Sequence, residues 1–159
     1  MSKLPTSCDR LMDGANDACV SFELLSEGET RAVVERVFDT HFPTRNRSRF
    51  YAGRGWIWAS SKDAGSVSYR LSMSEAEEDW KEFKQLMAGW PAGSIFVFFE
   101  WHESKHGLRF ESMGHLVDSV SESFILEDMY MTDAQSLGLA CLNHHDYLIL
   151  WGEAVDWVK

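Results

Sequence analysis

Residues 102–106 read His-Glu-Ser-Lys-His, which has the HExxH spacing of zinc-dependent hydrolases. In those enzymes the two histidines bind zinc from one face of a helix. Here the apolar run Phe96–Phe99 precedes the motif and Gly107 follows it, a pattern that predicts the end of a strand and a turn. Because His102 and His106 then share no helical face, we expect neither a metal nor another cofactor.

A second histidine group, Asn143-His144-His145-Asp146, lies between two apolar segments near the C-terminus. One interpretation is chemical, since a histidine oriented by an acid can act as a general base or bind a metal. Its neighbours would be His102, Glu103 and His106. The other interpretation is a polar turn, in which Asn143 and Asp146 bind turn amides. We favour the turn and keep a metal-dependent hydrolase that uses these His-rich turns as the alternative.

Four arginines lie in the segment Pro43–Gly55, close to several aromatic residues. Guanidinium groups bind anions in a forked geometry and stack on aromatic rings. We therefore list three of them, Arg45, Arg47 and Arg49, among the expected partner-binding residues. The alternative is a solvated loop whose arginines pair with acids of the same chain, since exposed ion pairs are common.

Acidic residues form two further groups that we expect to bind a partner. The first follows Ser74 on a predicted helix, and the second lies between residues 122 and 128. Clustered carboxylates steer a basic protein toward its binding site, although each group alone also fits an ordinary solvated surface. The residues are Glu75, Glu78, Asp79, Glu82, Glu122, Glu127 and Asp128.

Other catalytic patterns are missing from the sequence. It has no GxSxG elbow and no glycine-rich fingerprint for nucleotides. Its three cysteines lack a CxxC spacing, which argues against a disulfide framework and against a four-ligand zinc site. We expect Cys141 to be buried, and Cys8 and Cys19 to be exposed thiols.

The hydrophobic pattern predicts an α+β fold, with one domain over residues 1–159 in which residues 1–20 are irregular or form one short helix. We expect a mainly antiparallel sheet with two or three helices packed on it. Helices are predicted over 26–42, 74–88 and 113–121, the first two with a capping box. Strands are predicted over 20–25, 56–60, 66–72, 94–101 and 108–112, and a β-meander over 124–152 closes the sheet. A turn at 62–65 would join the second and third of these strands in a hairpin.

The net charge is −10, and only residues 43–73 are basic, with six Lys/Arg against one Asp/Glu. This field repels phosphate, so we expect no nucleic-acid binding. No run of apolar residues is long enough to span a membrane, and the N-terminus lacks the apolar stretch of a signal peptide. We therefore expect a cytoplasmic protein without membrane contact.

The C-terminal run EDMYMTDAQSLGLACLNHHDYLILWG resembles the tail of small α+β immunity proteins that accompany bacterial toxins. In both, a strand leads through a polar spacer to an apolar strand, a polar turn and a last strand. The resemblance covers about the last third of the chain and implies a bacterial inhibitor that binds its cognate toxin directly. It assigns no functional residue.

Charge and resemblance together lead us to expect a protein-binding module rather than an enzyme. It would neutralise a basic toxin domain, with acidic side chains in the place of substrate phosphates. Besides the hydrolase, a second alternative is an acidic regulator that mimics nucleic acid. Such a mimic would compete with DNA for several basic proteins, whereas an immunity protein would select one.

Overall fold

The computed structural model describes residues 5–54, 57–60, 66–71, 76–123 and 128–158. They form an α+β fold around a seven-stranded sheet in the order β1-β4-β3-β5-β6-β7-β2. Each pair of neighbouring strands is antiparallel. The strands are β1 (Phe22–Leu24), β2 (Val67–Arg70), β3 (Ile95–Phe98), β4 (Leu108–Phe110), β5 (Met129–Asp133), β6 (Gly138–Leu142) and β7 (Tyr147–Gly152).

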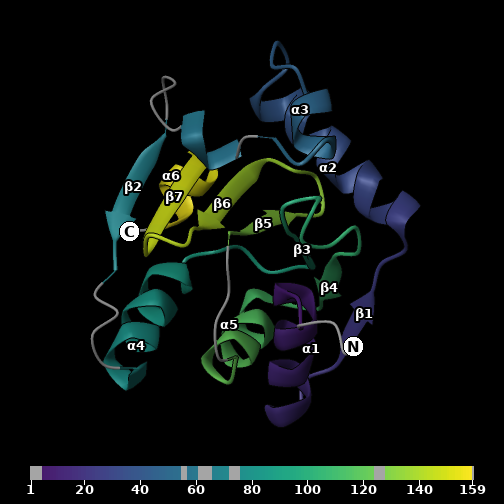
Figure 1. Ribbon diagram of the computed structural model, residues 1–159. Coiled ribbons are helices and arrows are strands. Elements are labelled where there is room, and N and C mark those ends of the chain that lie inside the picture. The colour runs from purple at the N-terminus through teal and green to yellow at the C-terminus, as the bar shows by residue number, and fades with distance from the viewer. Residues whose placement is uncertain (1–4, 55–56, 61–65, 72–75, 124–127, 159) are drawn as a thin grey trace.

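Helices cover both faces of the sheet, so the fold has three layers (Figure 1). One face is packed by α1 (Ser7–Asp17), α4 (Ala76–Met87) and α5 (Met113–Ser121). The other face is packed by α2 (Glu27–His41), α3 (Ser48–Tyr51) and the short 3₁₀ helix η1 (Ile57–Ser60). The last helix, α6 (Ala154–Trp157), follows β7 and contacts β6 and β7.

The central strands are apolar at successive positions because both of their faces are covered. In β6, Leu139 and Cys141 point into the core beneath α2, whereas Ala140 and Leu142 point into the core beneath α1, α4 and α5. This alternation is the normal geometry of a strand. Cys141 is fully buried, as expected, and Cys19 is exposed. The expectation for Cys8 was wrong, because this thiol is buried on the core-facing side of α1.

Most predicted elements are present. Ser26 caps α2, and its side chain and that of Glu29 form the expected capping box. The helix predicted over 113–121 coincides with α5, and the three strands of the meander are consecutive in the sheet. Ser74 lies outside the described residues, so the second capping box is not described.

The described residues form six α-helices rather than the two or three expected. The N-terminal segment folds as α1, which Thr6 and Asp9 close with a capping box. The arginine-rich segment contains the one-turn helix α3, whose residue Phe50 is buried beneath α2. Helix α3 is one turn long, which is too short to show a helical period, whereas in α1 the buried Cys8, Leu11 and Ala15 recur at helical spacing among polar residues.

The strand predicted over Trp56–Ser60 was wrong, because residues 57–60 form η1. The predicted hairpin is therefore wrong as well, because β2 pairs with β7, with Val67 opposite Leu150. Ile57 is buried in the core beneath α2, and the backbone N–H of Trp58 donates to the Tyr130 hydroxyl over 3.4 Å. A short apolar run fits a buried helical turn as well as a strand. The turn residues 62–65 lie outside the described residues.

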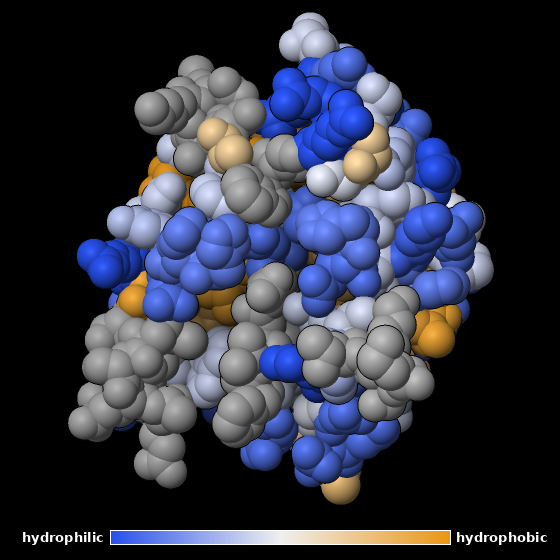
Figure 2. All heavy atoms as spheres, in the orientation of Figure 1, coloured by the Kyte–Doolittle hydropathy of each residue, from blue (hydrophilic) through white to orange (hydrophobic). Residues whose placement is uncertain are grey.

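The surface seen in Figure 2 is mainly hydrophilic, with hydrophobic residues only in small separate areas. The large apolar side chains that are exposed among the described residues are Leu24, Leu137 and Tyr147. None of the helices in the described ranges combines the length and the apolar character that crossing a bilayer requires.

Candidate functional site

The helices α1, α4 and α5 lie side by side on one face of the sheet, with α5 in contact with both of the others (Figure 1). The contact between α1 and α5 is close, because a Cβ at Gly14 would lie 2.3 Å from the Ser119 carbonyl oxygen. These three helices carry eight Asp/Glu against three Lys/Arg. We call this surface the acidic helical layer.

The opposite layer has the opposite balance. From the start of α2 to Arg54, the chain carries six arginines against four Asp/Glu. The net charge of −10 is therefore divided unevenly between the two faces of the sheet. A charge contrast of this kind orients an approaching charged molecule toward one face.

The structure divides the seven predicted acidic residues. Glu78, Asp79 and Glu82 lie in α4, and Glu122 is exposed at the C-terminal end of α5, so four of the seven belong to or border the acidic helical layer. Glu75 and Glu127 lie outside the described residues. Asp128 is 4% exposed and its carboxylate binds a histidine, so it does not contribute to an acidic surface.

Two of the three predicted arginines are engaged within the molecule. The Arg47 guanidinium donates to Glu35 over 3.2 Å and to Asp39 over 2.9 Å. Arg45 donates to the carbonyl of Ile57 and covers the Phe42 ring. Arg49 is exposed in α3. For Arg47 and Arg45 these contacts favour the alternative in which the arginines stabilise their own loop.

The two predicted histidine groups serve as structural turns. The Nδ1–H of His106 donates to the Leu25 carbonyl over 2.9 Å, and Glu103 accepts the Ser7 amide at the start of α1 over 2.7 Å. In the other group, the Asn143 side chain accepts the amides of His145 and Tyr147, as the turn interpretation predicted. Within the described ranges, no three His, Cys, Asp or Glu residues are placed to hold a metal ion.

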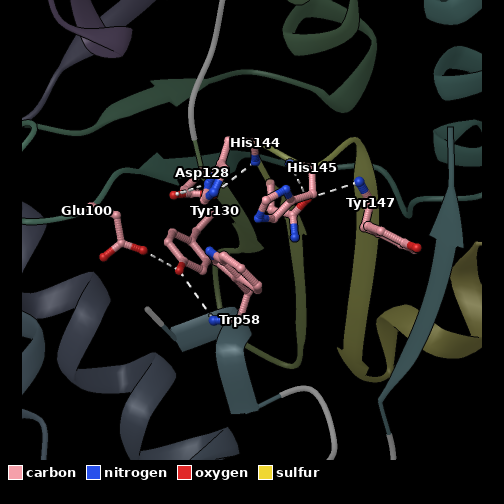
Figure 3. A network of polar contacts seen from close by, with 8 residues as sticks. Trp58, Glu100, Asp128, Tyr130, His144, His145 and Tyr147 are labelled. Atoms are coloured by element: carbon pink, nitrogen blue, oxygen red, sulfur yellow. Dashed lines mark hydrogen bonds and ion pairs between the residues drawn. The ribbon is translucent and has the colours of Figure 1, made fainter. Parts of the chain in front are cut away.

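His144 forms the most specific polar contact of that turn. Its Nδ1 lies 2.9 Å from one Asp128 carboxylate oxygen and 3.1 Å from the other, and its backbone N–H donates to the first of them (Figure 3). Asp128 has a positive φ of 23°, a conformation that needs support from its surroundings. The Trp58 ring packs edge-on against the rings of both His144 and His145.

A buried glutamate lies beside this pair, and the sequence reasoning missed it. Glu100 is 5% exposed, and the Tyr130 hydroxyl donates to its carboxyl group over 2.5 Å (Figure 3). Burial raises the pKa of Glu100 to about 8; the nearby Asp128 charge adds to this rise and the Tyr130 hydrogen bond opposes it. A charged residue directly after the apolar run Ile95–Phe99 was the signal in the sequence.

Comparison with protein-family models, with curated proteins and with solved structures finds no match to this chain.

Proposed function

We propose that this chain is a binding protein of the immunity type, which neutralises a basic toxin domain by docking it on the acidic helical layer. The observation that carries this proposal is the charge contrast between the two helical layers. It supports a partner that is basic and approaches the face made by α1, α4 and α5. Electrostatic steering of this kind raises association rates by one to three orders of magnitude in known complexes.

The exposed acids Asp118 and Glu122 provide the test, because they lie in and directly after α5, in the middle of the layer. Their neutral counterparts, Asp118→Asn and Glu122→Gln, remove two charges without changing side-chain size. The matched control removes two exposed charges from α2 on the opposite layer, with Glu27→Gln and Glu29→Gln. A glutamine at position 29 can keep the capping box with Ser26.

The experiment begins with affinity capture by the tagged chain from its native lysate, read by mass spectrometry. The proposal predicts one dominant stoichiometric basic partner. Its association rate with the α5 double variant is expected to fall by about tenfold at low salt, and the difference should shrink as salt is added. The control pair is expected to change the rate much less.

Two results would overturn the proposal. One is the capture of many basic proteins that DNA displaces, which is the behaviour of a nucleic-acid mimic. The other is an equal loss of rate in both double variants, because the partner would then respond to net charge and not to this face.

A further inference from the structure

A groove of about 440 Å³ lies between the C-terminal end of α4 and the N-terminal end of α5, within the acidic helical layer. Its walls are mostly apolar, and the charged residues that line it are Lys84 and Asp118. The volume falls within the roughly 300–1,000 Å³ of typical ligand pockets. The apolar lining consists mainly of Met87, Trp90, Pro91, Met113 and Val117.

Trp90 brings an unused hydrogen-bond donor to this region. The residue is 6% exposed and its ring packs edge-on against Trp157, with 4.9 Å between ring centroids. Its indole N–H is buried and has no acceptor among the residues that the structure describes. Buried donors are nearly always paired in native proteins, and an unpaired one costs about 1–3 kcal/mol.

The α5 side of the groove is negative. Residues 111–123 contain Glu111, Asp118 and Glu122, all three exposed, and no lysine or arginine. On the other side, the end of α4 that borders the groove carries Lys84. An occupant therefore meets an apolar floor with Glu111 and Asp118 on the α5 side, where cationic neighbours are favoured.

We propose that the groove receives one aromatic or long aliphatic side chain of the partner, flanked by lysine or arginine in an extended segment. This inference rests on the proposed function and specifies the anchor of that interface. The apolar side chain occupies part of the groove, and the flanking cations face Glu111 and Asp118 on the α5 side. A central apolar anchor with a charged rim is the usual arrangement of interface hot spots.

Gly114 offers a position where a side chain can be added at the groove. It lines the groove in the first turn of α5, and a Cβ at this position would meet only the Ser112 hydroxyl, at an ordinary distance of 3.7 Å. Gly28 is its counterpart in α2 on the opposite layer, where a Cβ would lie 4.0 Å from the nearest atom, the Ser26 hydroxyl. The substitutions Gly114→Phe and Gly28→Phe therefore form a matched pair.

The probes are three blocked pentapeptides that separate charge from apolar character: Lys-Lys-Phe-Lys-Lys, Lys-Lys-Gly-Lys-Lys and Glu-Glu-Phe-Glu-Glu. Each is titrated into the ¹⁵N-labelled full chain and followed by NMR. The Trp90 indole resonance is assigned with Trp90→Phe. We expect only the first peptide to shift the Trp90 indole and Gly114 amide resonances, with saturation, because both residues line the groove. Gly114→Phe is expected to weaken this binding by about tenfold or more, whereas Gly28→Phe leaves it unchanged.

The inference is overturned if the glycine peptide gives the same shifts, or if Gly114→Phe binds the first peptide as well as the unmodified chain does. The failure of this test can be told apart from the failure of the proposed function. If the captured partner depends on Asp118 and Glu122 but is unaffected by Gly114→Phe, the acidic layer remains the interface and the anchor groove is refuted. If no partner is captured while the peptide binds as expected, the immunity function is refuted and the groove remains a site for basic apolar segments.

Discussion

Replacing the buried Glu100 by glutamine tests the polar network at the end of the sheet. Glutamine keeps the shape of the side chain and an oxygen that can accept from the Tyr130 hydroxyl, but it cannot ionise. The pKa of Glu100 is raised from 4.5 to about 8 because burial penalises its charged form. Between these two values the folded chain holds a proton on Glu100 that the unfolded chain has lost.

The sign of the pH dependence follows from this difference. Because the native state binds more protons in this window, the free energy of unfolding falls as the pH rises from about 5 to about 9. With 1.36 kcal/mol for each pKa unit, the contribution of Glu100 changes by about 4 kcal/mol over this range. That is a large part of the 5–15 kcal/mol by which a typical domain is stable.

The assay is urea unfolding of the unmodified chain and of Glu100→Gln at several pH values. All other titrating groups are common to both proteins, so the difference between the two unfolding free energies isolates Glu100. We expect the variant to gain about 4 kcal/mol relative to the unmodified chain between about pH 5 and about pH 9. Glu111→Gln, at an exposed position, is the control and should show a much smaller change. A difference that stays constant with pH would refute the assignment of a neutral, buried Glu100.

Two further predictions concern contacts that position the helices. Thr30→Val should lower the free energy of unfolding by about 1–3 kcal/mol, because the buried Gly107 amide donates to the Thr30 hydroxyl over 2.8 Å and would lose its acceptor; Thr30→Ser, which keeps the hydroxyl, should cost less in the same urea titration. Gly14→Ala should lower the melting temperature, since the new methyl group meets the Ser119 carbonyl and overpacking typically costs 1–3 kcal/mol. Gly28→Ala, in open space, should not lower it, and equal effects at both glycines would contradict the close packing of α1 on α5.

The elements that the sequence predicted well are those with strong local signals. Helix α2 begins at a capping box that is visible in Ser26 and Glu29, and its buried residues recur at helical spacing. Strand β3 is central because its apolar run needs cover on both faces, and the structure places it between β4 and β5. Local chemistry and tertiary packing agree at these positions, so the pattern is sufficient.

The elements that the sequence predicted badly depend on distant partners. In the sequence, Asp128 belongs to an acidic group. In the fold it is buried against His144, which lies in the turn between β6 and β7. Ile57 has the same apolar character in a strand or in η1, and only packing beneath α2 decides between them. For the same reason the link between Glu100 and Tyr130 could not be predicted, since Glu100 follows β3, and β3 and β5 are neighbours only in the finished sheet.

The strand order has a consequence for how the chain assembles. Both edges of the sheet come from the N-terminal half: β1 pairs with β4, with Phe22 opposite Phe110, and β2 pairs with β7, with Val67 opposite Leu150. The interior of the sheet is made by β4, β3, β5, β6 and β7, which are synthesised later. During translation, the first two strands therefore emerge before the strands they pair with exist. The meander of β5, β6 and β7 can form from local contacts, whereas the edge pairings must close long loops and are intrinsically slow. A chain whose synthesis stops before β7 would leave β2 without its neighbour. The complete sheet can therefore form only after translation has passed Gly152.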